Sequence, residues 1–258
     1  MHSDQELLDL QNTLYTSRNP TRRWLHVSRR DWIEARIRQL GAGCSRALEV
    51  GPGSGIYLSV LAEMAENVVA ADIEDAYLDQ ARVIAQSLPG LCCVRDDITS
   101  TRLEAGAYDL ILCTEVIEHI ADSRAAIAGM ARLLTPGGTL LLTTPQRYSP
   151  LELCAKVAFL PGIIQLVRLV YREPIIETGH INLLTESDLR AQIQAAGLEI
   201  VETYKSGFYL PLVAEIGGRA GQRVLQWCES RLRGSALSGL LWTQYYVLTK
   251  GNESVENR

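Results

Sequence analysis

The chain has 258 residues, of which 47% are apolar and 21% are charged, a composition typical of a globular protein. Its net charge is −5, and adjacent basic residues occur only at Arg22 with Arg23 and at Arg29 with Arg30, which argues against a nucleic-acid-binding surface. The start is polar and acidic, and no apolar stretch reaches about 20 residues, so we expect neither a signal peptide nor a membrane span. The six cysteines form no C-x-x-C pair, so we expect reduced thiols and a cytoplasmic protein.

Residues 1–43 predict a helical N-terminal segment. Apolar residues recur at helical spacing from Asp31 to Leu40, and Gly41 and Gly43 then end the helix.

From residue 44 onward, short apolar segments alternate with helical ones. The predicted strands are 47–50, 68–71, 91–94, 110–113, 139–144, 198–204 and 240–249. The predicted helices are 56–64, 76–86, one capped by Asp122 or Ser123 that runs through Leu134, and one opened by Thr185 with Asp188 as its capping-box partner and closed by Gly197. A turn at 135–138 precedes the fifth strand. This alternation indicates an α/β domain over 44–250 with a parallel sheet covered on both faces, followed by a polar tail at 251–258.

Two segments interrupt this alternation, at 145–184 and 207–238, and we expect both to be helical lid insertions. The first is strongly apolar from Leu151 to Tyr171, with Phe159 and Ile163 among its apolar residues. One interpretation is an apolar roof over a lipophilic acceptor, which also touches a membrane surface to collect it. The other is a homodimer interface or plain packing.

A glycine-rich loop joins the first strand to the first helix, with the sequence Glu49-Val50-Gly51-Pro52-Gly53-Ser54-Gly55. Glycines let a backbone approach a ligand closely, because no side chain intervenes. Asp72 follows the second strand, where a carboxylate can accept hydrogen bonds from both hydroxyls of a ribose. A dinucleotide-binding loop would require a glycine where Ile56 stands.

The G-x-G-x-G spacing preceded by Glu49 resembles motif I of the class I S-adenosylmethionine-dependent methyltransferases. Residues 108–114 and 133–140 are similar to that family's fourth strand and to its turn into the fifth. The resemblance implies a Rossmann-like seven-stranded sheet whose last strand is antiparallel, and S-adenosylmethionine as the cofactor. The cofactor-binding residues that it implies are Glu49, Gly51, Gly53, Gly55, Asp72, Ile73, Asp97, Ile98 and Thr114. Asp97 would accept a hydrogen bond from the exocyclic amine of adenine, and Ile98 would pack on the ring.

The segment Asn19-Pro20-Thr21-Arg22 resembles the N-P-x-R segment of ubiquinone-pathway O-methyltransferases, in which an arginine helps to hold the cofactor. The planar fork of a guanidinium suits the methionine carboxylate of that cofactor. The resemblance therefore implies a cofactor role for Arg22, with Arg23 as an equal candidate.

The fourth strand is followed by Glu115, Glu118 and His119, which would share one face of a helical turn. Two carboxylates and an imidazole can bind a divalent cation such as magnesium, manganese or zinc. The E-x-x-E-H pattern resembles the metal site of small-RNA 2′-O-methyltransferases and of ubiquinone O-methyltransferases, for which His180 would be a further ligand. Relatives that need no metal also carry this pattern. In that case Glu115 lines the cofactor pocket, and His180 or His119 is the general base.

These features predict an S-adenosylmethionine-dependent O-methyltransferase of small-molecule biosynthesis, with a lipophilic hydroxylated acceptor such as a quinol or a secondary metabolite. The alternatives are C- or N-methylation of a similar molecule, RNA 2′-O-methylation, and a non-catalytic binding module. The acidic charge and the apolar insertions disfavour RNA. The intact glycine loop and Asp72 disfavour a module without activity.

Overall fold

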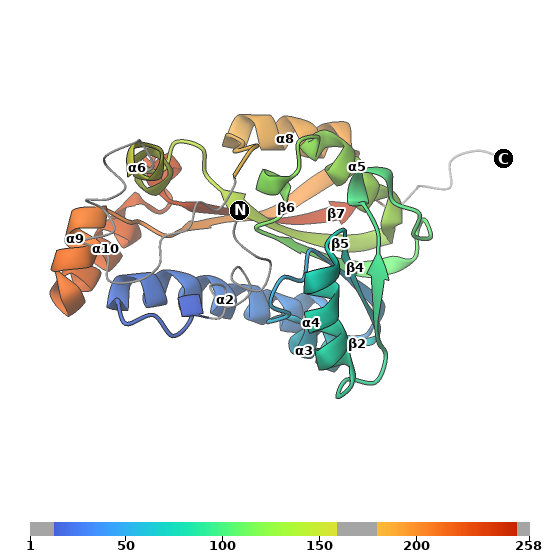
Figure 1. The fold of residues 1–258 in the computed structure, drawn as a ribbon. Coiled ribbons are helices and arrows are strands. Elements are labelled where there is room, and N and C mark those ends of the chain that lie inside the picture. The colour runs from blue at the N-terminus through green and yellow to red at the C-terminus, as the bar shows by residue number, and fades with distance from the viewer. Residues whose placement is uncertain (1–12, 159–179, 252–258) are drawn as a thin grey trace.

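The fold was analysed in a computed structural model that describes residues 13–158 and 180–251. Its centre is a seven-stranded sheet with the order β3-β2-β1-β4-β5-β7-β6, in which β7 runs antiparallel to both of its neighbours (Figure 1). The strands are β1 (Cys44–Val50), β2 (Ala65–Asp72), β3 (Leu91–Arg95), β4 (Tyr108–Thr114), β5 (Leu134–Pro145), β6 (Leu198–Ser206) and β7 (Thr243–Lys250). The predicted Rossmann-like sheet with an antiparallel last strand is confirmed.

Helices cover both faces of the sheet, because its central strands are apolar on both sides. In β4, Leu110 and Leu112 contribute to one buried cluster, and Ile111 and Cys113 contribute to the other. The first cluster includes residues of α2 (Pro20–Leu40), α3 (Leu58–Met64) and α4 (Asp75–Ala85). The second includes residues of α5 (Ser123–Leu133) and α8 (Glu186–Ala195). The alternation follows from the two-residue period of a strand.

Helix α2 confirms the predicted N-terminal helix, and it begins at Pro20, well before the helical spacing that the sequence shows from Asp31 to Leu40. Asn19 caps it by accepting hydrogen bonds from the backbone N–H groups of Thr21 and Arg22, and the helix ends at Leu40 before Gly41. Ile33 and Ile37 are fully buried against the sheet. The helix therefore shares the core of the domain, and a division of the chain at residue 43 stays a prediction.

The expected turn at 135–138 lies within β5. Tyr108 pairs with Leu134, and Leu110 pairs with Thr139, so the register shifts between these two pairs. The ladder with β4 thus continues on both sides of the glycine pair, and the segment is a bulge in a longer strand.

The two insertions supply helices that lie together at one end of the molecule, beyond the start of α2 (Figure 1). The first contains α6 (Pro150–Ala158), while Phe159 and Ile163 lie outside the described residues. The second contains two helices, α9 (Pro211–Ile216) and α10 (Gly218–Leu232), so its expected helical character is confirmed. Leu25, Ala214 and Leu225 join them in a third buried cluster.

Within residues 13–158 and 180–251, no helix has both the length and the apolar character needed to cross a membrane.

Candidate functional site

The glycine loop follows the carboxyl end of β1 and depends on positive backbone angles. The φ angles of Gly51, Gly53 and Gly55 are +70°, +52° and +74°. A Cβ atom on Gly51 would lie 2.5 Å from Val116 Cγ2, so only glycine lets Val116 pack there. The loop that follows β1 therefore lies directly against the segment that follows β4.

Two carboxyl groups accompany this loop. Glu49 is 1% exposed, and its Oε2 has no hydrogen-bond partner among residues 13–158 and 180–251. Burial raises the pKa of Glu49 well above its ordinary value. Asp72, at the end of β2, accepts a hydrogen bond from the Glu74 N–H at 2.9 Å, and burial raises its pKa as well.

These groups fit S-adenosylmethionine. Its ammonium and sulfonium groups are cationic, and an unpartnered buried carboxylate such as Glu49 is a suitable counter-charge. The carboxylate of Asp72 can accept further hydrogen bonds, as the two hydroxyl groups of a ribose would require. Ile73 is 52% exposed beside it, which is unusual for an isoleucine and provides an apolar surface.

The segment predicted to hold adenine forms a short 3-10 helix, η1 (Ile98–Ser100), after β3. Asp97 is exposed and caps this helix by accepting hydrogen bonds from Thr99 N–H and Oγ1–H. Ile98 is 6% exposed and contributes to the core beneath α5, so packing on a ring stays a prediction. Asp96, which the sequence did not single out, has a buried Oδ2 without a hydrogen-bond partner in the described part of the chain.

Arg22 contacts the second insertion. Its Nε lies 3.0 Å from Glu215 Oε1, and Asn19 Nδ2 donates to Ala214 O and to Glu215 Oε2. Tyr209 Oη–H donates to the same carboxylate. The Asn19-Pro20-Thr21-Arg22 segment thus attaches α9 to the start of α2. The cofactor role assigned to Arg22 remains a prediction.

Arg29, two helical turns further along α2, contacts the site instead. Its Nη1 lies 2.5 Å from Glu115 Oε2, and its guanidinium lies 5.2 Å from the ring centre of Trp242. Burial alone would lower the pKa of Arg29, but Glu115 together with Tyr15, Tyr57 and Tyr245 outweighs burial and keeps this pKa above its ordinary value. The pKa of His26, whose Nδ1 lies 3.2 Å from Arg29 Nη2, is lowered by burial and by Arg29. No local pattern distinguishes Arg29 from the other arginines of α2, because its role depends on a partner, Glu115, that lies far along the sequence.

The E-x-x-E-H segment does not form the expected helical face. Glu115 has a φ of +55°, and the 3-10 helix η2 (Ile117–His119) begins only after Val116. The carboxylate of Glu115 faces Arg29 and accepts a hydrogen bond from Thr143 Oγ1–H at 2.9 Å. The expectation that Glu115 shares a face with Glu118 and His119 is therefore wrong, because the left-handed backbone conformation of Glu115 leaves it outside the helical turn that carries the other two residues.

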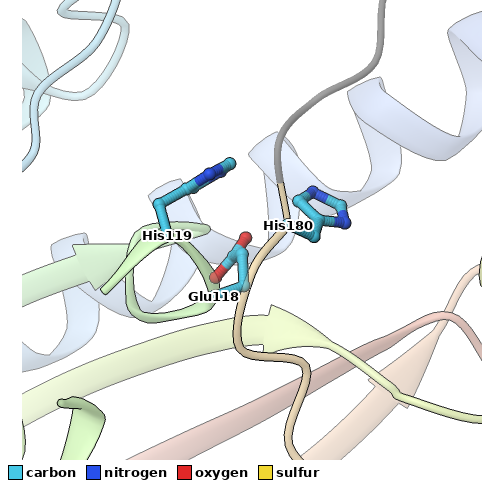
Figure 2. A group of neighbouring side chains, drawn as sticks. All are labelled: Glu118, His119 and His180. Atoms are coloured by element: carbon cyan, nitrogen blue, oxygen red, sulfur yellow. The ribbon is translucent and has the colours of Figure 1, made fainter. Parts of the chain in front are cut away.

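Three of the four predicted metal ligands, Glu118, His119 and His180, do come together, and Glu115 is not part of their group (Figure 2). Each offers a ligand atom, and these atoms lie within 4.8 Å of one another. Glu118 is fully buried, and its Oε2 accepts a hydrogen bond from Thr144 Oγ1–H at 2.9 Å. Its Oε1 has no partner within the described residues, and burial together with Glu115 raises its pKa well above the ordinary value. A cation would compensate this buried charge.

Backbone hydrogen bonds fix His180 beside Glu118. The N–H groups of Ile181 and Asn182 both donate to Glu118 O, at 3.0 and 2.9 Å, and Asn182 Nδ2 donates to Ile120 O. The imidazole centres of His119 and His180 are 5.2 Å apart. This explains how a residue far along the sequence joins the cluster.

His180 has a further partner that the sequence did not reveal. Its Nδ1 lies 3.2 Å from Glu152 Oε2 on α6, and Trp242 Nε1–H donates to Glu152 Oε1. Burial alone would raise the pKa of Glu152, but the hydrogen bonds from His180 and Trp242 hold it below its ordinary value.

The glycine loop and the cluster lie at the same edge of the sheet. Val50 pairs with Cys113 near the ends of β1 and β4. Thr114, the last residue of β4, and the residues after it are therefore neighbours of the loop that follows β1. A ligand in the loop would thus lie next to one buried carboxyl and two imidazoles.

Comparisons with known protein sequences agree with this arrangement. A family model described as a methyltransferase domain matches residues 21–203. A ubiquinone biosynthesis O-methyltransferase of Xanthomonas campestris pv. campestris (strain B100) is 34% identical over 127 residues, which are 48% of this chain and 51% of that protein. The chain thus spans about half the length of that relative. The protein of the same name from Xanthomonas axonopodis pv. citri (strain 306) is 30% identical over 181 residues, 68% of this chain and 70% of that protein.

A solved structure agrees with the fold. Magnesium protoporphyrin IX methyltransferase from Synechocystis PCC 6803, solved with bound SAH, superposes with a TM-score of 0.63 at 16% identity and covers 96% of both chains. The family model, the sequence relatives and the strand order confirm the resemblance seen in the motifs. The chain belongs to the family of class I S-adenosylmethionine-dependent methyltransferases.

Proposed function

We propose that this protein transfers the methyl group of S-adenosylmethionine to a hydroxyl oxygen of a lipophilic small molecule, such as a quinol or a secondary metabolite. The observation that carries the proposal is that the glycine loop lies against Val116, in the segment that bears Glu118 and His119, and that His180 joins these two residues in one cluster. A phenol, with a pKa near ~10, is a poor nucleophile until its proton is removed. An imidazole beside the cofactor can accept that proton near neutral pH.

We propose that the loop residues, Glu49 and Asp72 hold the cofactor, with Ile73, Asp97, Ile98 and Thr114 around the adenine and ribose. Methyl transfer demands an in-line approach of the acceptor oxygen to the sulfonium carbon. The chain therefore contributes a fixed cofactor position, alignment of the acceptor, and exclusion of water.

We further propose that Glu118, His119 and His180 hold a divalent cation. The unpartnered Oε1 of Glu118 supports it, because a buried carboxylate needs a compensating charge. When bound, such a cation would lower the pKa of the acceptor hydroxyl. Without it, His180 or His119 accepts the proton alone.

The acceptor and the setting of the enzyme are also proposals. On α6, Leu153 and Val157 are 46% and 54% exposed at a four-residue spacing, which supports an apolar roof or a contact with a membrane surface or a second copy. All six cysteines are free thiols, which supports a reducing, cytoplasmic environment. C- or N-methylation and RNA 2′-O-methylation are the competing reactions, and the atom that receives the methyl group distinguishes them.

Asp72→Ala should weaken S-adenosylmethionine binding by about 1.5–3 kcal/mol, the free energy of a charge-assisted hydrogen bond. Titration calorimetry measures this change. Asp75→Ala is the matched control, since the side chain of Asp75 is 62% exposed and pairs with the exposed Arg95. Equal affinities of the wild type and Asp72→Ala would remove Asp72 from the ribose role.

Glu49→Gln should stabilise the ligand-free protein and weaken cofactor binding. Because the folded-state pKa of Glu49 is raised, the wild type loses stability as pH rises from the ordinary glutamate range toward that pKa, by up to about 1.4 kcal/mol per pH unit. The difference in unfolding free energy between the two proteins should therefore grow with pH in denaturant titrations. A constant difference would show that Glu49 is not a buried, uncompensated carboxyl.

Removal of divalent cations should lower activity on the order of 10²-fold, because assistance to deprotonation is lost. Dialysis against a chelator, followed by addition of magnesium, manganese or zinc, measures this in methyl-transfer assays and in metal-titration calorimetry. Glu118→Gln should lose the heat of metal binding, whereas Glu115→Gln should keep it. Full activity in the chelated enzyme would contradict the metal and leave a histidine as the base.

Acceptors of rising chain length should show rising kcat/KM, by up to ~0.8 kcal/mol or about fourfold per buried methylene. Leu153→Ser and Val157→Ser should flatten this rise without changing cofactor affinity. Val201→Ser, at a position on β6 that is 66% exposed, is the control. A flat profile in the wild type would make the first insertion structural.

A further inference from the structure

Glu152 is a buried carboxylate that joins the first insertion to the proposed site. It lies on α6, is 6% exposed, and uses both oxygens. Oε2 lies 3.2 Å from His180 Nδ1, and Oε1 accepts the Trp242 Nε1–H at 2.9 Å. The first insertion covers residues 145–184, so Glu152 lies near its beginning and His180 near its end. Their contact therefore joins the two ends of the insertion.

The position of Glu152 is determined from two sides. Its backbone N–H donates to Oγ of Ser149, which is fully buried. On the other side, Trp242 is fixed by the backbone, since its N–H donates to Gly207 O at 2.8 Å and its carbonyl accepts from the Gln146 N–H. The carboxylate is therefore held in place independently of His180.

A carboxylate offers only acceptor sites, so the imidazole nitrogen that faces it must carry the proton. A neutral imidazole has one N–H and one lone pair. When Nδ1–H donates to Glu152, the lone pair is on Nε2, and this nitrogen is the one that can accept a proton or bind a cation.

We propose that Glu152 is a positioning residue that fixes His180 in its Nδ1–H tautomer and so keeps the Nε2 lone pair available at the site. The proposal rests on the proposed function, which assigns His180 its role. The first insertion would then have a second role besides covering an acceptor, because α6 carries Glu152, which orients the imidazole of His180.

Nitrogen NMR of the chelator-treated protein tests the proposal without activity. The chain has four histidines, so ¹⁵N-histidine labelling gives few signals, and His180→Asn assigns that of His180. We expect His180 in the Nδ1–H form in the wild type. The Nε2–H form in the wild type would overturn the proposal before any variant is made.

Two variants distinguish whether Glu152 orients the imidazole of His180 or only stabilises the surrounding structure. Glu152→Gln should change the tautomer of His180, because an amide can also donate, whereas Trp242→Phe breaks the other hydrogen bond of Glu152 and should leave the tautomer unchanged. Glu152→Gln should also lower kcat by about 10–100-fold with an unchanged KM for the cofactor. An unchanged His180 signal in Glu152→Gln, or an equal change in Trp242→Phe, would refute the proposal.

A failure of the proposed function can be distinguished from a failure of the role proposed for Glu152. If His180→Asn kept full methyl-transfer activity, His180 would have no catalytic role, whereas the tautomer measured in the wild type would still report whether Glu152 orients it.

Discussion

The site depends on one buried carboxyl group, that of Glu118, where three segments of the chain meet. Its backbone carbonyl accepts hydrogen bonds from Ile181 and Asn182, and its side chain accepts one from Thr144 at the end of β5. A carboxyl with an unpartnered oxygen is costly to bury. This carboxyl lies close to the place where the loop after β1 touches the segment after β4.

The two glutamates of the E-x-x-E-H segment have different partners, because Glu115 has a left-handed backbone conformation and lies outside the helical turn that carries Glu118. Glu115 pairs with Arg29 of the N-terminal helix, and Arg29 lies over the ring of Trp242. The same tryptophan donates to Glu152, which holds His180. A continuous series of contacts therefore links α2 and the first insertion to the proposed site.

The sequence predicted the sheet well, since strands such as β4 are short apolar runs and their hydrophobic pattern alone determines burial on both faces. It also predicted the pairing of His180 with Glu118 and His119, through a resemblance rather than through local periodicity. It missed the left-handed conformation of Glu115, because a positive φ in a non-glycine residue leaves no signature in the sequence. Arg29 and Glu152 were missed because their roles depend on contacts between segments that are distant in the sequence. For the same reason, no local pattern revealed that the Asn19-Pro20-Thr21-Arg22 segment contacts Glu215 of α9.

The proposed activation of a hydroxyl oxygen at this edge of the sheet is tested most directly by mass spectrometry of cell extract incubated with the enzyme and isotopically labelled S-adenosylmethionine. We expect one labelled metabolite that is apolar and hydroxylated, with the labelled methyl group on oxygen. A label on nitrogen, on carbon or on RNA would contradict it.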